Sequence, residues 1–214
     1  MNYKKLAYLN LFLVSATVIC FEIIATRISS VIFVSNYAFI ILSLAIFGLG
    51  MGGVFSYYRF NSSKIPRVIR TIACFIFLTG ISLLLFIISV IGFSITNPFI
   101  YFPLLFLPFF FAGVVYALIF RIFADESFKL YASDLIGAAV GSGLSLLIFN
   151  FFNAPNAVLF LSLIMFLAAV IFSREFFKKK TVIGVYILIF SGMLLLGCFG
   201  RKEFLGEVPI GKFP

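Results

Sequence analysis

Seven long apolar stretches, separated by short polar connections, dominate the sequence. Each is close to the roughly 20 residues that a helix needs to cross about 30 Å of hydrocarbon. No run alternates between apolar and polar positions as the strands of a membrane barrel do. Because lipid offers the backbone no hydrogen-bonding partners, the pattern predicts an all-α, polytopic transmembrane bundle. The predicted spans of this single membrane domain, 1–200, are about 6–26, 37–57, 68–93, 98–120, 131–152, 155–173 and 181–200, and 201–214 reads as a polar tail or linker.

Composition agrees with this class, since 64% of the residues are hydrophobic, 11% are charged and the mean hydropathy is +1.24. With seven alternating spans, 12 of the 16 Lys and Arg residues fall on the same side of the membrane as the N-terminus, and 4 fall on the opposite side. The positive-inside rule therefore places the N-terminus in the cytoplasm and, with seven spans, the C-terminus outside. We expect a multi-pass protein of the cell inner (plasma) membrane, with its first span retained because no A-x-A cleavage site follows it.

The residue types present exclude several classes of site. The chain has no histidine, and its three cysteines each fall inside a different predicted span. The absence of histidine and the scattered cysteines exclude most types of zinc and haem site, and every hydrolase that uses a Ser/His or Cys/His pair. We therefore predict no metal, no cofactor and no catalytic residue. The net charge of +9 is spread over separate loops, so a nucleic-acid partner is not expected.

Three ionisable side chains interrupt the apolar spans: Glu22, Arg27 and Asp134. A charge at bilayer depth costs a few kcal/mol on insertion scales, about 2.5–3.5 at a helix centre, so such residues usually have a partner and a function. By helix rise, Glu22 is expected near the outer face and Asp134 near the inner one, about 20 Å apart in depth. We therefore treat them as two separate features.

Each feature has a structural and a functional interpretation. Glu22 pairs with Arg27 if the first helix ends near Thr26, or else faces an outer cavity and recognises a cation. Asp134 caps the start of the fifth helix together with Ser133, or lines a pocket with Tyr131. The segment 27–36 is a short interfacial piece, or the first helix is simply longer and tilted.

Small residues and prolines mark three spans. Gly48 and Gly52, like Gly137 and Gly141, are spaced four apart and allow close helix packing, although such glycines can also leave room for a substrate. The fourth span contains Pro103 and Pro108, which predict a kink or local unwinding. Broken helices often border a cavity in membrane proteins, but kinked helices are also purely structural.

Two stretches of the chain carry a family resemblance. The runs 21–27 (FEIIATR), 36–39 (NYAF) and 48–53 (GLGMGG), followed by 131–141 (YASDLIGAAVG), resemble the membrane-embedded region of spermidine-synthase-like integral membrane proteins. A less specific likeness joins 108–113 (PFFFAG) to that family's fourth span. The resemblance covers roughly residues 10–150. It adds positions to the candidate binding or intramembrane polar residues, which are then Glu22, Arg27, Asn36, Tyr37, Tyr131 and Asp134.

In that family the membrane region is commonly fused to an aminopropyltransferase-like domain that binds decarboxylated S-adenosylmethionine. This chain has no glycine-rich strand–loop–helix and no acidic catalytic pair. We therefore expect a non-catalytic membrane module that acts with a transferase domain or subunit in polyamine-related or similar small-molecule chemistry.

The alternative function is a transporter of a small cation such as a polyamine. No inverted repeat is evident in the sequence, and seven spans divide poorly into halves. The expected partners are the lipid bilayer and a transferase, with a second copy of the chain left open.

Overall fold

The computed structural model describes residues 3–33, 38–60, 65–92, 97–151 and 153–176. These residues form six long α-helices and one short 3-10 turn, and each long helix is long and apolar enough to cross a membrane. The all-helical prediction is confirmed for this part of the chain. The predicted seventh span, the tail 201–214, Asn36 and Tyr37 lie outside the described residues. The elements are α1 (Tyr3–Ile32), α2 (Ala38–Phe60), α3 (Ile65–Gly92), α4 (Pro98–Ile122), η2 (Ala124–Glu126), α5 (Ser127–Phe151) and α6 (Ala154–Phe176).

The two outermost helices display apolar side chains along most of their length. On α2, Phe39 and Tyr58 are about four-fifths exposed, and on α5 so is Phe128. Contiguous apolar surface of this extent is unsuited to water. Together with six apolar helices of spanning length, it indicates a multi-pass membrane protein.

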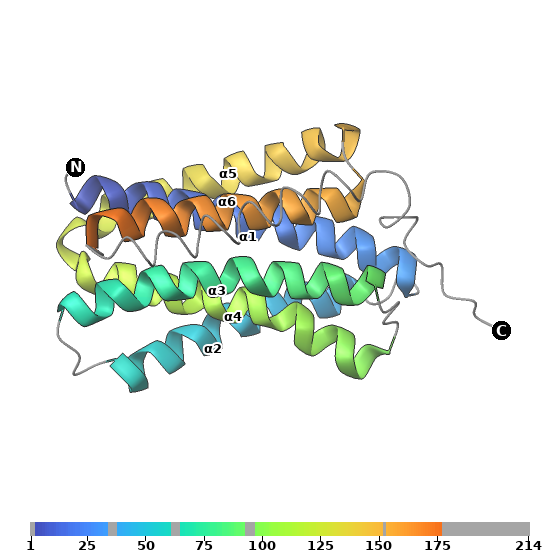
Figure 1. Ribbon diagram of the computed structural model, residues 1–214, viewed down its shortest axis with the longest axis horizontal. Coiled ribbons are helices and arrows are strands. Elements are labelled where there is room, and N and C mark those ends of the chain that lie inside the picture. Colours follow the sequence, from blue (N-terminus) through green and yellow to red (C-terminus); the bar gives the residue numbers. More distant parts are fainter. Residues whose placement is uncertain (1–2, 34–37, 61–64, 93–96, 152, 177–214) are drawn as a thin grey trace.

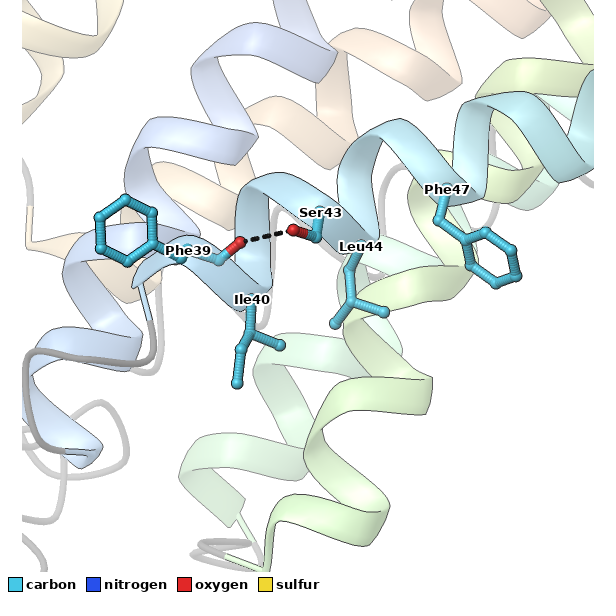
Figure 2. A pocket seen from close by; sticks show the side chains of 5 residues that line it. All are labelled: Phe39, Ile40, Ser43, Leu44 and Phe47. Atoms are coloured by element: carbon cyan, nitrogen blue, oxygen red, sulfur yellow. Dashed lines mark hydrogen bonds between the residues drawn. The ribbon is translucent and has the colours of Figure 1, made fainter.

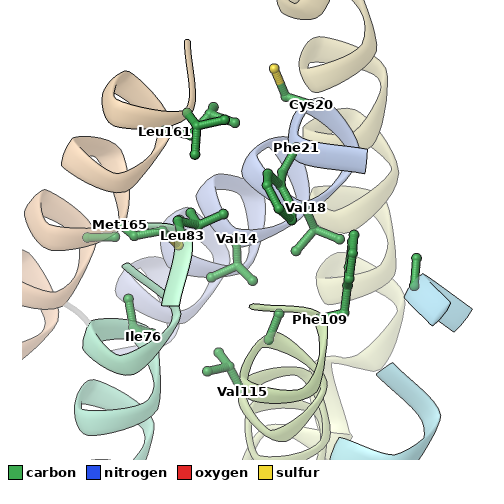
Figure 3. Packing of buried hydrophobic residues seen from close by; sticks show 14 of the residues in the cluster. Val14, Val18, Cys20, Phe21, Ile76, Leu83, Phe109, Val115, Leu161 and Met165 are labelled. Atoms are coloured by element: carbon green, nitrogen blue, oxygen red, sulfur yellow. The ribbon is translucent and has the colours of Figure 1, made fainter. Parts of the chain in front are cut away.

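Successive helices run in opposite directions and lie side by side in a fixed order (Figure 1). From one edge of the bundle to the other the order is α5, α1, α6, α3, α4 and α2. The α1 helix is the most central: Figure 3 shows Val14, Val18 and Phe21 of α1 among side chains from α3, α4 and α6. The ring of Phe21 lies 5.4 Å from those of both Phe86 and Phe109, so aromatic packing joins α1 to α3 and α4.

The packing contains two three-helix units of opposite orientation. In one, α5 packs parallel to α1, and α1 packs antiparallel to α6; in the other, α2 packs parallel to α4, and α4 packs antiparallel to α3. Exchanging α1 with α4, α2 with α5 and α3 with α6 maps one unit onto the other and reverses every helix. The same exchange relates the Gly48/Gly52 pair of α2 to the Gly137/Gly141 pair of α5, each of which faces its parallel neighbour.

Glycines make the parallel contacts possible. A Cβ on Gly48 would lie 2.7 Å from the Phe109 Cβ, and one on Gly52 would lie 2.8 Å from the Val114 nitrogen. On the other unit, a Cβ on Gly141 would lie 2.8 Å from the Ala16 Cα. Only hydrogen fits at these three positions, so the backbones of α2 and α4, and of α5 and α1, approach closely.

Two predicted helix boundaries were wrong, and both change the surroundings of the charges. The α1 helix continues beyond Thr26 to Ile32, because Ile28 and Ile32 still find buried packing positions. The longer-helix alternative for segment 27–36 therefore holds as far as Ile32. The α5 helix begins at Ser127, so Asp134 lies in its third turn and does not cap its start.

The α4 helix starts as its sequence suggests. The side chain of Asn97 accepts a hydrogen bond of 3.0 Å from the Phe99 nitrogen, and Pro98 occupies the first turn, where its missing N–H costs nothing. Pro103 and Pro108 lie within one continuous helix, so the predicted local unwinding does not occur. Each proline still removes one intrahelical hydrogen bond, and Pro108 leaves the Leu104 carbonyl without its usual donor.

Candidate functional site

A row of polar residues runs along one face of α1. Tyr8, Ser15, Glu22 and Ser29 are spaced seven apart, which is close to two helical turns. They therefore line up on one side of an otherwise apolar helix. We call these four residues the α1 polar row. Ser15 finds its partner on α5 and Ser29 finds its partner on α4, so this side of α1 meets those two helices.

The far end of the α1 polar row is closed by a buried hydroxyl pair. The Ser29 hydroxyl and the Tyr101 hydroxyl of α4 share a hydrogen bond of 2.6 Å, and both residues are fully buried. The Tyr101 ring packs edge-on against Phe33 and Phe86 at 5.1 and 5.4 Å. This end is a structural clamp, because each polar atom has a partner and aromatic rings exclude water.

The middle of the α1 polar row meets Asp134. The Ser15 hydroxyl donates a hydrogen bond of 2.8 Å to the Asp134 backbone oxygen. The Tyr116 hydroxyl of α4 lies close enough to the Asp134 carboxylate and the Ser15 hydroxyl to interact with both. Three helices thus meet at one polar cluster, which we call the Asp134 cluster (Ser15, Tyr116 and Asp134).

The near end of the α1 polar row is held by a seam to α5. The Ser133 hydroxyl donates a hydrogen bond of 2.7 Å to the Tyr8 backbone oxygen. Beside it, the Glu126 carboxylate binds the Lys4 ammonium at 2.7 Å and the Lys129 ammonium at 2.8 Å. These residues lie at the end of the bundle that also carries Arg59, Arg67 and Arg121, and we call it the basic end.

Glu22 differs from its neighbours in the row. It is half-buried, and among the residues that the structure describes its carboxylate makes no ion pair and no hydrogen bond. The nearby Thr26 hydroxyl bonds the Glu22 backbone oxygen and leaves the carboxylate unengaged. The residue lies about 7 Å from the midpoint of α1 by helix rise.

The structure keeps the two carboxylates about as far apart as the sequence predicts. On α5, Ser133 bonds Tyr8, and Gly137 and Gly141 face Phe12 and Ala16 of α1, so Asp134 lies level with about Leu9. Glu22 lies 13 residues further along α1, about 20 Å by helix rise. The two carboxylates are therefore separate features, although the Ser15 hydroxyl bonds the Asp134 backbone oxygen.

The remaining candidates take no part in this row. Arg27 follows Glu22 by five positions on a continuous helix and so points to another face; the alternative in which α1 ends near Thr26 and Arg27 folds back is wrong. Tyr131 is 55% exposed on the outside of α5 and does not form a pocket wall with Asp134.

No protein-family model, curated protein or solved structure matches the chain.

A shallow groove on α2 offers no chemistry of its own. It is lined by Phe39, Ile40, Ser43, Leu44 and Phe47 from that single helix (Figure 2). Its one hydroxyl, on Ser43, already donates to the Phe39 backbone oxygen at 2.9 Å. Within the described ranges no three metal-ligating side chains gather at one place.

Sequence reasoning missed four members of the site: Ser15 and Ser29 on α1, and Tyr101 and Tyr116 on α4. A signal was present, because polar residues at seven-residue spacing in a span otherwise rich in hydrocarbon mark a single helix face. The tyrosines gave no such signal, since only the antiparallel register of α1 and α4 brings them to that face.

Proposed function

We propose that the protein is a plasma-membrane transporter of a small organic cation, such as a polyamine, with Glu22 as the cation-binding carboxylate. The observation that carries the proposal is the state of Glu22: half-buried, near the middle of α1, and without a partner among the described residues. An isolated carboxylate at such depth is costly, so it attracts a cation or a proton.

The surroundings of Glu22 support a passage rather than a closed core. It lies in the α1 polar row, which faces the other three-helix unit through α4. Phe21 and Phe109 mark the same level of the bundle, where Pro108 leaves the carbonyl of Leu104 without its usual donor. Inverted units with a binding site at their interface are a common design of secondary transporters.

The proposed orientation has the basic end in the cytoplasm. The side chains of Lys4, Arg59, Arg67, Arg121 and Lys129 gather there, as the positive-inside rule requires. A cation would then move between the Asp134 cluster, on the cytoplasmic side, and the Tyr101–Ser29 clamp on the outer side.

The test is uptake of radiolabelled spermidine into vesicles that contain the purified protein. Glu22→Gln keeps the shape of the side chain and removes its charge, and we expect uptake to fall at least tenfold. Asp125→Asn is the control, since it also removes a carboxylate charge, at an exposed site of η2, and should leave uptake within twofold. Equal uptake by the parent protein and the Glu22 variant would refute the proposal.

A second measurement reports binding without transport. Dicyclohexylcarbodiimide is apolar and adds to protonated carboxyl groups within membranes. We expect it to label Glu22, and spermidine to protect this residue from labelling. Protection without uptake would favour binding over transport.

The second candidate function is a non-catalytic membrane module that presents its ligand to a separate transferase, as the family resemblance suggests. One observation favours it: Phe128 and Tyr131 are exposed next to the Glu126 ion pairs at the basic end, where a cytoplasmic enzyme could dock. Co-purification of an aminopropyltransferase-like protein, lost on Phe128→Ala, would support this function.

A further inference from the structure

We propose that the basic end of the α2–α3–α4 unit binds the headgroup of an anionic phospholipid. The site consists of four exposed arginines, which we call the arginine patch: Arg59 on α2, Arg67 and Arg70 on α3, and Arg121 on α4. This inference goes beyond the transport of a cation and does not depend on Glu22.

The charges at the basic end are divided unequally between the two three-helix units. In the unit that contains α1, Lys4 and Lys129 are both paired with the Glu126 carboxylate, at 2.7 and 2.8 Å. In the other unit, α2, α3 and α4 contain no aspartate and no glutamate. The acidic residue nearest to the patch in the sequence is Asp125, four positions after Arg121. A single carboxylate cannot neutralise four guanidinium groups, so the arginine patch keeps a net positive charge.

Phe60 joins the ends of the three helices that carry the patch. The Arg121 guanidinium donates a hydrogen bond to the Phe60 backbone oxygen, which connects α4 to α2. The Phe60 ring lies 6.2 Å from the ring of Phe75 on α3. Arg59 directly precedes Phe60, and Arg67 lies eight residues before Phe75, about 12 Å nearer the basic end by helix rise. The arginines therefore gather where α2 and α4 end and α3 begins (Figure 1).

The helix dipoles explain two of these arginines and leave Arg67 without a structural reason. Arg59 and Arg121 lie in the last turns of α2 and α4, where the helix dipole is negative and a cation is favourable. Arg67 lies in the first turn of α3, at the positive end of that dipole, where a cation is unfavourable. It is exposed and makes no ion pair with any residue that the structure describes. An anion beside Arg67 would remove this cost.

The surroundings of the patch favour a phospholipid over a soluble anion. Met51, Val54 and Tyr58 follow one exposed face of α2 and lead directly to Arg59. Such side chains can contact acyl chains, and exposed tyrosines are typical of the level of lipid headgroups. Guanidinium groups form paired hydrogen bonds with phosphate oxygens, and a net positive charge selects an anionic headgroup over a zwitterionic one. The site therefore matches both the phosphate and the chains of such a lipid.

The test is lipid binding by the purified whole chain in neutral detergent, measured by native mass spectrometry. We expect phosphatidylglycerol to bind at least tenfold more tightly than phosphatidylcholine. Arg67→Gln should weaken phosphatidylglycerol binding about fivefold, as expected for one basic residue beside an anionic headgroup, and leave phosphatidylcholine binding unchanged. Lys5→Gln is the matched control, because it removes one exposed basic charge from the same end of the other unit. It should change both affinities by less than twofold.

Three results would overturn the inference. Equal affinity for the two lipids would exclude selection by charge. Equal losses in Arg67→Gln and Lys5→Gln would mean that only the overall charge of the basic end matters. Displacement of phosphatidylglycerol by inorganic phosphate or a hexaglutamate peptide at the same concentration would identify a soluble anion, and not a lipid, as the ligand.

Arg67→Lys gives a second test, because it keeps the positive charge at the start of α3. We expect it to retain phosphatidylglycerol binding within twofold of the parent protein. A loss as large as that of Arg67→Gln would contradict attraction by charge.

Discussion

Replacing Glu22 with leucine should make the protein more stable. An ionised side chain at the centre of a membrane helix costs about 2.5–3.5 kcal/mol on insertion scales, and leucine is favourable by about 0.3–0.6 kcal/mol. Glu22 is half-buried and lies off the midpoint of α1, so we take about half of the combined difference. The expected gain in the free energy of unfolding is about 1.5–2 kcal/mol.

The assay is unfolding by SDS in bicelles, followed by far-UV circular dichroism, because the chain contains no tryptophan for fluorescence. Asp134→Leu is the comparison variant. It deprives the Tyr116 hydroxyl of a partner, so it should lower the stability by about 1 kcal/mol. The same type of substitution then has opposite signs at the carboxylates of α1 and α5.

A loss of more than about 1 kcal/mol for Glu22→Leu would refute the reasoning, since it would mean that the carboxylate has a stabilising partner in the folded protein. The proposed cation site would then lose its basis. A gain in stability accompanied by lost transport is the trade expected of a functional residue held at a cost.

Three further predictions concern packing and topology. Gly52→Leu and Gly141→Leu should each prevent folding or lower the free energy of unfolding by at least about 1–3 kcal/mol through overpacking. Gly50→Leu and Gly143→Leu should be tolerated, because an added Cβ meets nothing within 4 Å there. Unfolding by SDS compares each variant with its control. Tyr101→Phe should lower the free energy of unfolding by about 0.6–1.7 kcal/mol, because it removes the hydrogen bond to Ser29. The double variant with Ser29→Ala should lose little more, and additive losses would contradict a shared hydrogen bond. A reporter fused after α6 should be active in the cytoplasm and one fused at the C-terminus outside it; a cytoplasmic C-terminus would remove the predicted seventh span.

The class of fold could be predicted because hydropathy and length act locally. Spans of the required length appear in the sequence without knowledge of any neighbour, and the starts of α2 and α4 lay within a residue of the prediction. The predicted ends of α1 and the predicted start of α5 differed from those of the structure. Polar residues such as Arg27 and Lys129 are allowed in helix turns near a membrane surface, so polarity alone does not mark where a helix ends.

The candidate site could be predicted only in part. Glu22 and Asp134 could be identified from the sequence because charged residues are rare in membrane spans. A charged residue at that depth is costly and therefore usually has a partner or a function. Their partners depended on which helices pack together. Ser15 meets Asp134 because glycines let α1 and α5 approach in parallel, and Tyr116 joins them because α4 runs antiparallel to α1.

Local chemistry thus determined that this chain forms apolar helices with a few costly charges. The tertiary structure alone decided which of those charges is paired, because pairing depends on helix register and order in the bundle, and no pattern along one helix encodes the helix beside it. The inverted three-helix units likewise became visible only in the packing, although glycines spaced four apart occur on both α2 and α5.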